Sequence, residues 1–497
     1  MINNTLFEEN ISSKGGSIYI QQSQLLLENN TFHKDVSQYG GSIYSENSIL
    51  NISKSQFSNC TSTFGGCIFS YLGNIALDTI QSIYSAASQD GGFLYINAAS
   101  KFILLNLSVN QSFAQNNGGS IYVINSRAID SYIAFSSFEK NMAKGSGGAI
   151  LLDNTELLMY QSSFKQNQAG IGGAIRYLNL KPSFLFNRQK QIQDSCKTYS
   201  QNYCKNNKAV IFGNQIASYP SYASILPSKD FTVDIKQYPN VFFHNFRSGM
   251  NNFDLVIQFL DEFKKTVYQI DFQNKTIINM LSQQLIDEIR QYSCRVYINE
   301  NYTDLQQEVI KLDGATLVDY SYYGKNKVGC LMNNFKITGV PESVSIMMLQ
   351  LNGMRVVNST NQFVDLNNIQ INIEFRQCEA GEYYIQNCEG CQLYECSQCQ
   401  NGTYSLTQPT RDHQVKCKEC DKSQVELCYL NQIKLRENYW RTNNQSDLIY
   451  ACSTANQYCN GDQSKGYCAV GYTGALCSAC DNRGKLWGDN YGQFQFT

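Results

Sequence analysis

The chain has 497 residues and a formal net charge of −2, with basic and acidic side chains interspersed along its length. This length is typical of about three domains, and the charge pattern lacks the basic footprint of proteins that bind nucleic acid or an anionic membrane surface. The sequence has no apolar run of 18 residues and no basic and apolar leader after Met1, so neither a membrane-spanning helix nor a signal peptide is predicted.

A Gly-Gly pair followed by a small, an aliphatic and usually an aromatic residue recurs through the first third of the chain. The seven pairs begin at residues 15, 40, 65, 91, 118, 147 and 172, and an apolar marker precedes each of them at Phe7, Phe32, Phe57, Tyr84, Val109, Phe138 and Phe164. Between the two markers, apolar residues alternate with period two, as at Leu25 and Leu27. This period indicates strands and not helices.

Three short strands per repeat of about 25 residues cannot bury a face alone, but stacked coils form one continuous core. We therefore predict a right-handed parallel β-helix over residues 1–225, with the Gly pair at a corner whose φ values a Cβ would oppose. Seven coils are clear to about residue 180. Residues 208–212 mimic the repeat without its Gly pair and predict a degenerate terminal coil, after an insertion that Cys196 and Cys204 could close as a disulfide.

One column of the repeat is the most uniformly apolar and is expected to face the core: Ile18, Ile43, Ile68, Leu94, Ile121, Ile150 and Ile175. The residues that follow would then face outward: Tyr19, Tyr44, Phe69, Tyr95 and Tyr122, continued by Leu151 and Arg176. Such an aromatic ladder suits the binding of a sugar or a peptide. The alternative is that Tyr simply favours strands and lies under a loop or inside the coil.

Longer alternating strands without the repeat, such as "FDLVIQFLDE" and "VSIMMLQLNG", predict a β-sandwich over residues 226–376. A short helix is expected around residues 281–290, where the apolar spacing is helical. Cys294 and Cys330 are a candidate disulfide pair.

Residues 377–497 hold thirteen of the 19 cysteines. A segment of this density relies on disulfides, which persist in an oxidising compartment. The alternative is zinc, because the pairs Cys388/Cys391, Cys396/Cys399 and Cys417/Cys420 have ligand spacing, but only four residues separate the first two pairs. Thirteen is odd, and a partner of Cys480 is expected beyond Thr497. The chain is therefore interpreted as part of a larger ectodomain.

Sequons for N-glycosylation occur throughout the chain, and several of those on the coils are expected to be sterically buried. They lie at Asn3, Asn10, Asn29, Asn51, Asn59, Asn106, Asn110, Asn274, Asn301, Asn358, Asn401 and Asn444.

The Gly-Gly-x-Ile and Phe-x-x-Asn markers of residues 1–180 resemble the repeats of chlamydial polymorphic outer-membrane proteins, which implies a pectin-lyase-like β-helix. The order of segments resembles large surface proteins of ciliates, in which a Cys-rich region precedes transmembrane helices. This resemblance implies an extracellular location and attachment to a membrane through segments absent from this chain.

The Cys-rich region resembles growth-factor-receptor modules in its cadence of Cys, Gly and Tyr from Cys378 and again from Cys399. Its end, "CAVGYTGALCSAC", resembles the closing loop of EGF-like modules, which implies a disulfide between Cys468 and Cys477. The Cys-x-Cys that precedes this loop in an EGF-like module is absent, which puts a complete module in doubt.

No catalytic, cofactor or metal site is predicted. Glycosidase carboxylates lie about 5 to 9.5 Å apart, whereas Glu46 and Asp153 share a column at about 19 Å, and Glu28 and Asp78 share another at about 10 Å. HExxH and GxSxG are absent. We expect a non-enzymatic cell-surface ectodomain for adhesion, sensing or display, whose partner is a protein or a glycan and not nucleic acid. The alternatives are a carbohydrate-active enzyme of the pectate-lyase type and, more weakly, an intracellular zinc-binding scaffold.

Overall fold

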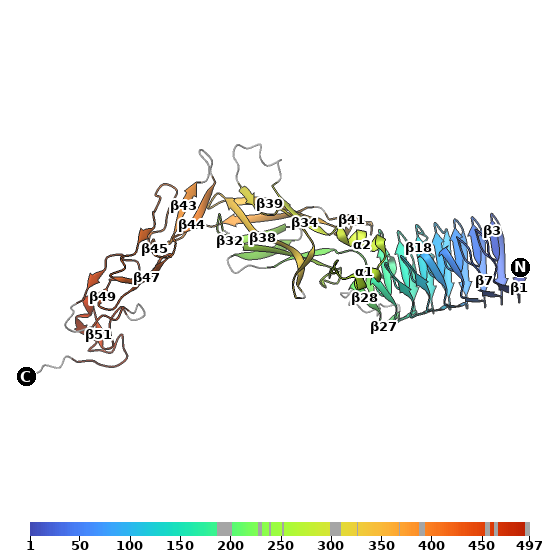
Figure 1. The fold of residues 1–497 in the computed structure, drawn as a ribbon, viewed down its shortest axis with the longest axis horizontal. Coiled ribbons are helices and arrows are strands. Elements are labelled where there is room, and N and C mark those ends of the chain that lie inside the picture. The colour runs from blue at the N-terminus through green and yellow to red at the C-terminus, as the bar shows by residue number, and fades with distance from the viewer. Residues whose placement is uncertain are drawn as a thin grey trace, which may run out of the picture.

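The structure is a computed structural model of the chain, and it describes all residues except 186–200, 227–230, 238–239, 251–252, 299–309, 326, 367, 387–392, 453–457, 462–465 and 493–497. Figure 1 shows an elongated, bent molecule made of three parts in chain order: a solenoid of stacked coils, a pair of β-sheets, and a thin segment of small hairpins that ends at the C-terminus. The fold is all-β apart from short helices, as predicted.

Four parallel sheets, named A to D here, run along the solenoid, so that each coil has four sides and not the three strands that were expected. Sheet A contains β1 (Ile2–Asn3), β4 (Gln24–Glu28), β7 (Ile49–Ser53), β11 (Asn74–Asp78), β15 (Lys101–Leu105), β19 (Tyr132–Ala134) and β23 (Leu158–Tyr160). Sheet B contains β2 (Leu6–Glu8), β5 (Thr31–His33), β8 (Gln56–Ser58), β12 (Gln81–Ile83), β16 (Ser108–Asn110), β20 (Ser137–Glu139), β24 (Ser163–Lys165) and β27 (Tyr203–Lys205).

The other two sides of the coil meet at the Gly pairs. Sheet C contains β9 (Thr61–Phe64), β13 (Ala86–Asp90), β17 (Phe113–Ala114), β21 (Met142–Ala143), β25 (Gln168–Ile171) and β28 (Lys208–Phe212). Sheet D contains β3 (Ile18–Gln21), β6 (Ile43–Glu46), β10 (Ile68–Tyr71), β14 (Leu94–Asn97), β18 (Ile121–Ile124), β22 (Ile150–Asp153), β26 (Ile175–Leu178) and β29 (Ile216–Ala217).

The Gly pairs stand at the corner between sheets C and D for two physical reasons. The first Gly of each pair has a positive φ, from 59° at Gly15 to 71° at Gly91, which residues with a Cβ adopt at a cost. The second Gly leaves no room, because a Cβ on Gly66 would lie 1.9 Å from the carbonyl oxygen of Gly92 in the next coil. The corner that the repeat predicted is confirmed.

In-register stacking places equal positions of the repeat in columns inside the coil. Ile43, Ile68 and Leu94 are neighbours in sheet D and belong to one continuous apolar core. A buried polar column accompanies it, in which the Asn141 backbone N–H donates to the Asn167 side chain at 2.9 Å, and the Asn167 N–H to the Asn207 side chain at 2.9 Å. Each buried amide thereby satisfies a backbone group of the neighbouring coil.

The eighth coil exists, but its register differs from the prediction. β28 pairs with β25 through Lys208 and Gln168, so residues 208–212 form the strand that precedes the Gly pair. Gly213, with φ of 71°, and Asn214 occupy the place of the pair.

Two sheets and one apolar core follow the solenoid. The larger sheet contains β30 (Tyr222–Ile225), β33 (Phe253–Leu260), β38 (Lys327–Gly339), β44 (Tyr394–Gln398) and β43 (Glu382–Gln386), with β35 (Ile310–Asp313) and β37 (Ser321–Gly324) also paired to β38. The smaller sheet contains β31 (Thr232–Gln237), β32 (Asn240–Phe246), β42 (Ile369–Phe375), β39 (Val344–Asn352), β34 (Ser293–Tyr297) and β36 (Leu317–Asp319). This sandwich therefore begins at β30 and reaches past residue 376 through β43 and β44.

Short elements complete the chain. A 3₁₀ turn, η1 (Ser183–Leu185), follows the seventh coil, and the sandwich carries α1 (Lys275–Asn279), α2 (Gln283–Arg290) and the hairpin β40 (Arg355–Val357) with β41 (Phe363–Asp365). α2 confirms the predicted helix. The Cys-rich segment pairs β45 (Thr403–Tyr404) with β46 (Lys418–Glu419), β47 (Val425–Tyr429) with β48 (Gln432–Leu435), β49 (Tyr439–Trp440) with β50 (Tyr450–Ala451), and β51 (Tyr472–Thr473) with β52 (Ala479–Cys480), and η4 (Ala475–Cys477) lies between the last two. None of the helices in the described ranges combines the length and apolarity needed to span a bilayer.

Candidate functional site

The predicted aromatic ladder lies outside the coil core, but it is not an exposed face. We call the angle between the outward sides of sheets C and D the outer corner. In the first coils the residue before the Gly pair contacts the ladder there: the Tyr39 ring lies 5.3 Å from that of Phe69, and the Phe64 ring 5.6 Å from that of Tyr95. Because two rows of side chains fill this angle, they form a second apolar cluster.

The expectation of a binding face is therefore corrected for four of the five ladder residues. Tyr44, Phe69, Tyr95 and Tyr122 are 5 to 9% exposed, and only Tyr19 is open, at 47%. Arg176 agrees with the outward assignment of this column, since its side chain points away from the coil core, but it is only 1% exposed. Period-two alternation correctly predicted which side chains point out of the coil. A side chain that points out of the coil is, however, not necessarily in contact with solvent.

Ring stacking along the axis argues against a sugar platform in the same column. Tyr44 and Phe69 stack at 5.3 Å and 2°, and Phe69 and Tyr95 at 4.9 Å and 8°. A sugar binds an aromatic side chain through the face of its ring, and these faces are already covered by the ring of the next coil. The ladder is thus a stabilising spine for the solenoid.

Helix α2 fills the outer corner where the ladder ends. Its N-cap residue Ser282 donates its backbone N–H to the Lys144 carbonyl at 3.0 Å, and the Asn117 side chain donates to Gln284 at 3.2 Å. Gly170 makes the close approach possible, because a Cβ there would lie 2.1 Å from a methyl carbon of Leu285. The helix is buried against the solenoid through this contact and against the sandwich core through Ile286 and Ile289.

An ion pair joins the same helix to the last coils. Arg176 donates to Glu288 at 3.0 Å and in a second, shorter hydrogen bond, and it also donates to the Ser146 hydroxyl at 2.6 Å. This bidentate geometry pairs the two terminal nitrogens of a guanidinium that is almost fully removed from water, while its buried Nε has no hydrogen-bond partner among the described residues.

The hairpin β40–β41 closes the end of the solenoid. Phe363 belongs to the coil core and packs 5.1 Å from the Tyr219 ring, and its backbone N–H donates to the Asn179 carbonyl at 3.0 Å. Arg355 donates to the Tyr219 hydroxyl at 2.9 Å and to the Asn179 side chain at 3.2 Å. The last coil is therefore covered by an element of the sandwich, as an exposed sheet end requires.

Two carboxyl groups that the sequence analysis did not bring together lie near the outer corner. Asp90 precedes a Gly pair and accepts hydrogen bonds from the Asn117 backbone and side chain, both at 3.0 Å, and burial raises its pKa to about 6. Burial also raises the pKa of Asp153, which accepts from Asn179 at 2.6 Å. Both carboxylates act on Tyr95, whose pKa burial and then these charges raise to about 12. In the sequence, Asp90 could have been singled out as the residue before a Gly pair. Asp153 lies in a different sheet, so the repeat did not indicate that the two carboxyl groups would lie near the same corner.

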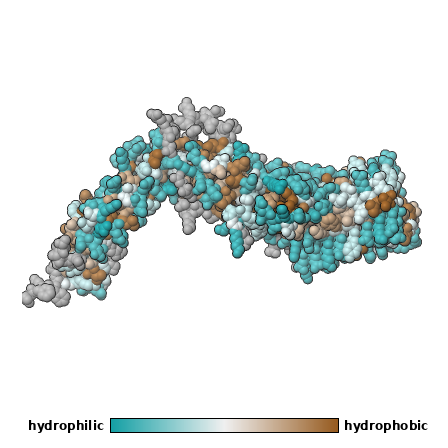
Figure 2. All heavy atoms as spheres, in the orientation of Figure 1, coloured by the Kyte–Doolittle hydropathy of each residue, from teal (hydrophilic) through white to brown (hydrophobic). Residues whose placement is uncertain are grey.

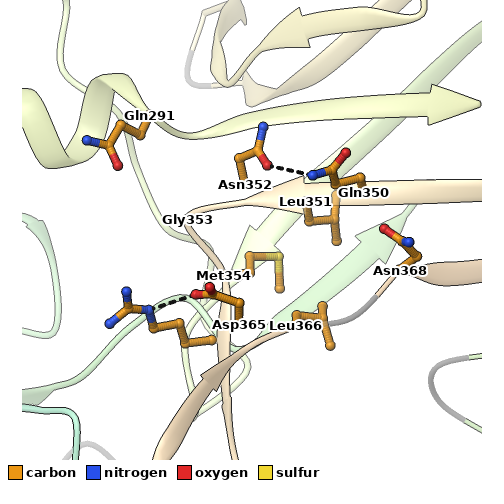
Figure 3. A pocket seen from close by; sticks show the side chains of 10 residues that line it. Gln291, Gln350, Leu351, Asn352, Gly353, Met354, Asp365, Leu366 and Asn368 are labelled. Carbon is orange, nitrogen blue, oxygen red and sulfur yellow. Dashed lines mark hydrogen bonds and ion pairs between the residues drawn. The ribbon is translucent and has the colours of Figure 1, made fainter.

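A polar hollow of about 690 Å³ lies in the sandwich beside this closure. Figure 3 shows Gln350 and Asn352 on one wall, Leu366 and Asn368 on the opposite side, and Gln291 approaching from the end of a helix. Leu351 and Met354 lie among them, and an ion pair of 3.0 Å joins Arg355 to Asp365 at the edge. No sequence pattern marked these residues, because they come from the ends of five separate elements, α2, β39, β40, β41 and β42.

Disulfides hold the region that was predicted to need them. Cys294 and Cys330 are bonded and join the two sheets of the sandwich, and Cys468 and Cys477 are bonded in the last loop, the pairs that were expected. Further disulfides between described residues are Cys378–Cys396, Cys399–Cys417, Cys420–Cys428 and Cys452–Cys459. Cys204 is disulfide-bonded, while Cys196 lies outside the described residues.

These bonds correct the zinc alternative where the structure tests it. Cys396, Cys399, Cys417 and Cys420 use their sulfur atoms in disulfides, while Cys388 and Cys391 lie outside the described residues. Within the described ranges, the cluster of Cys378, Glu382 and Cys396 has metal-ligand proximity, but its two sulfur atoms are bonded to each other. Cys480 is a free thiol, as are Cys60 and Cys67 in the solenoid core.

The sequons are more accessible than was expected. Asn29, Asn59 and Asn106 are exposed on the solenoid, and Asn51 and Asn110 are half-buried. The stacked coils do not bury them because the first three stand at corners with positive φ, where the side chain points away from the core. Asn301 lies outside the described residues.

Comparison with known proteins gives one match. Residues 135–153 are similar to the Chlamydia polymorphic membrane protein repeat, and they cover β20 to β22 of the solenoid. No curated protein and no solved structure matches the chain.

Proposed function

We propose that the chain is a non-enzymatic extracellular part of a cell-surface protein, in which the solenoid and sandwich form a stiff arm for adhesion, sensing or display. The observation that carries the proposal is the union of a polymorphic-membrane-protein-like repeat with a segment that has only small apolar clusters and five described disulfides. Such disulfides persist outside reducing compartments. The accessible sequons agree with the same location.

The face of the molecule in Figure 2 agrees with an extracellular location in contact with water. The face in Figure 2 is mostly hydrophilic over the solenoid, with separate hydrophobic areas near its N-terminal end and over the middle of the molecule. The partner is expected to be a protein or a glycan, and attachment to the membrane would come from segments outside this chain.

The test is location on intact cells of the source organism. An antibody raised against the solenoid should label living cells without permeabilisation, and disulfide mapping of the extracted protein should recover Cys294–Cys330 and Cys468–Cys477. Labelling that requires permeabilisation, together with alkylatable thiols at these four positions, would reject the proposal.

One observation favours a second candidate, a carbohydrate-active enzyme of the pectate-lyase-like type. Asp90 and Asp153 place two carboxyl groups with raised pKa values near tyrosines of one corner, and such groups serve as general acids. The closed packing of the corner favours the non-enzymatic function. Cleavage of polygalacturonate that Asp90→Asn abolishes would reverse this preference.

A further inference from the structure

We infer that the hollow beside the β40–β41 hairpin is a binding site for a short, uncharged oligosaccharide. The site is independent of the proposed location, because it rests on the side chains of the hollow alone. Its residues belong to the ends of β39, α2 and β41 and to the starts of β40 and β42.

The hollow exists because β39 and β42 separate. Their pairing runs as far as Leu349 and Ile369, and the next backbone hydrogen bond between described residues is the one that the Leu366 N–H donates to the Met354 carbonyl at 3.1 Å. Gly353, with φ of 86°, turns the chain after β39 between these two points. The volume of about 690 Å³ is in the range of small-ligand sites.

Carboxamide groups dominate the polar lining. The Gln350 amide donates to Asn352 at 3.3 Å, and Asn352 donates to the Ser293 hydroxyl at 2.8 Å, which holds these two side chains in place. Gln291 and Asn368 are exposed and have no side-chain hydrogen bond to any described residue. A carboxamide both donates and accepts, as does a sugar hydroxyl, so the two free amides can each engage a pair of hydroxyl groups.

Charge and the apolar surface narrow the ligand class. The charged residues in the described lining are Arg355 and Asp365, and they pair with each other at 3.0 Å, so the site has no surplus charge for an anionic sugar. Leu351 and Met354 are 4% and 1% exposed and pack in the sandwich core behind the hollow, so the half-buried Leu366 supplies the apolar surface for the C–H groups of a sugar ring.

An extended peptide fits the same place less well. Such a peptide binds by adding a strand to a free sheet edge, but residues 350–352 pair with β34 on one edge, and their other edge, beyond the last β42 pair at Leu349, is only this short segment. β39 is an inner strand of its sheet.

The test is a titration of the full chain with neutral trisaccharides (maltotriose, cellotriose, N-acetylchitotriose and mannotriose), read by saturation-transfer NMR. At least one should bind with a Kd in the millimolar range or below, and the double variant Gln291→Ala/Asn368→Ala should weaken it by about tenfold, the loss of one or two hydrogen bonds. Both side chains are exposed, so this variant should fold, and circular dichroism checks it. Gln432→Ala, in a separate hollow of the Cys-rich segment, is the matched control and should leave the Kd unchanged.

Three results would overturn the inference. These are no transfer to any trisaccharide at about 10 mM, which corresponds to negligible affinity, equal binding by the double variant and the parent chain, or variant-sensitive binding of trigalacturonate or of N-acetyl-tetraglycine amide in place of the neutral sugars. Asn352→Leu provides a second variant inside the wall, and its failure to weaken a trisaccharide that binds would count against the site as well.

Discussion

The outer corner is closed in two different ways along one solenoid. In the first coils, large side chains close it, with Tyr39 and Phe64 packed on the ladder. In the last coils, Ser146 and Ile171 stand at these positions, Ile171 belongs to the same apolar cluster as Leu285 of α2, and Gly170 beside it leaves room for that helix, which takes the place of the rings. The outer corner is therefore closed by the solenoid's own side chains in the first coils and by a helix of the sandwich in the last coils. Because α2 closes the corner of the last coils, the sandwich is packed into the solenoid structure and is not an independent domain on a flexible linker.

The Gly pairs occur in the first coils, the aromatic half of the solenoid, and in the last coils, the helix-closed half. Substitution of these glycines should therefore have the largest effect on stability, and the effect should be similar in the two halves. A Cβ on Gly66 would lie 1.9 Å, and one on Gly148 2.2 Å, from a carbonyl oxygen of the next coil. We expect Gly66→Ala and Gly148→Ala each to lower the free energy of unfolding by at least about 3 kcal/mol in urea. Gly324→Ala, whose nearest neighbour is 3.6 Å away, is the control. A loss below about 1 kcal/mol at both corners would contradict the packing described here.

The aromatic half should respond to the loss of a single ring. Phe69→Ala removes stacking on Tyr44 and Tyr95 and should lower the free energy of unfolding by about 3 kcal/mol. Tyr19→Ala, at the exposed end of the same column, should cost under about 1 kcal/mol. Equal losses from the two variants, measured by urea denaturation, would mean that the ladder is an open surface.

The helix-closed half should respond to the loss of the ion pair. Arg176→Met leaves Glu288 without its partner, and because that carboxylate is about one-third exposed and can be hydrated, we expect a loss of about 2 kcal/mol, below the range for fully buried pairs. The double variant Arg176→Met/Glu288→Leu should recover part of it. If the double variant is as unstable as the single one, the charge pair is not what holds the helix.

The smallest expected effect is a pH dependence of stability that comes from Asp90, at the boundary between the two halves. Asp90 stands where the two closures meet, and its pKa in the folded chain, about 6, exceeds the ordinary value of 3.8. The folded state therefore holds this proton more tightly than the unfolded chain, so stability is greatest at low pH and falls as the pH rises from about 4 to about 6. Asp90→Asn should remove this fall, being nearly neutral at pH 4 and stabilising by about 1 to 2 kcal/mol at pH 8.

Urea unfolding at the two pH values measures the effect, and Asp130→Asn, at an exposed carboxylate, is the control. Destabilisation of Asp90→Asn at pH 8 would show that the carboxylate form is favoured there.

Much of this architecture could be predicted from the sequence, because in-register stacking repeats each physical requirement. The Gly pairs, the Ile43 column and the Phe markers recur since every coil needs the same corner and core. The fourth side escaped prediction because its strands are short, as in Phe113–Ala114, and show no alternation. The burial of the ladder was not predicted because alternation indicates only which side of its own sheet a residue lies on. It does not indicate which side chains of the neighbouring sheet cover that side.

The oligosaccharide hollow could not be predicted at all. Gln291, Gln350 and Asn368 are common residues in this chain and are brought together only by the separation of β39 from β42. The pairing of Cys294 with Cys330 was accessible by contrast, because these are the two cysteines of the sandwich region in the sequence.

The most direct test of the central claim is native-state hydrogen exchange of α2 in the full chain. An isolated helix of eight residues is marginal in water, so slow exchange of its amides requires packing. The account predicts that the amides of Ile286 to Arg290 exchange as slowly as those of β26, through opening of the solenoid itself. Fast exchange of α2 while β26 remains protected would contradict it, and the sandwich would then be a domain tethered to a solenoid that does not need it.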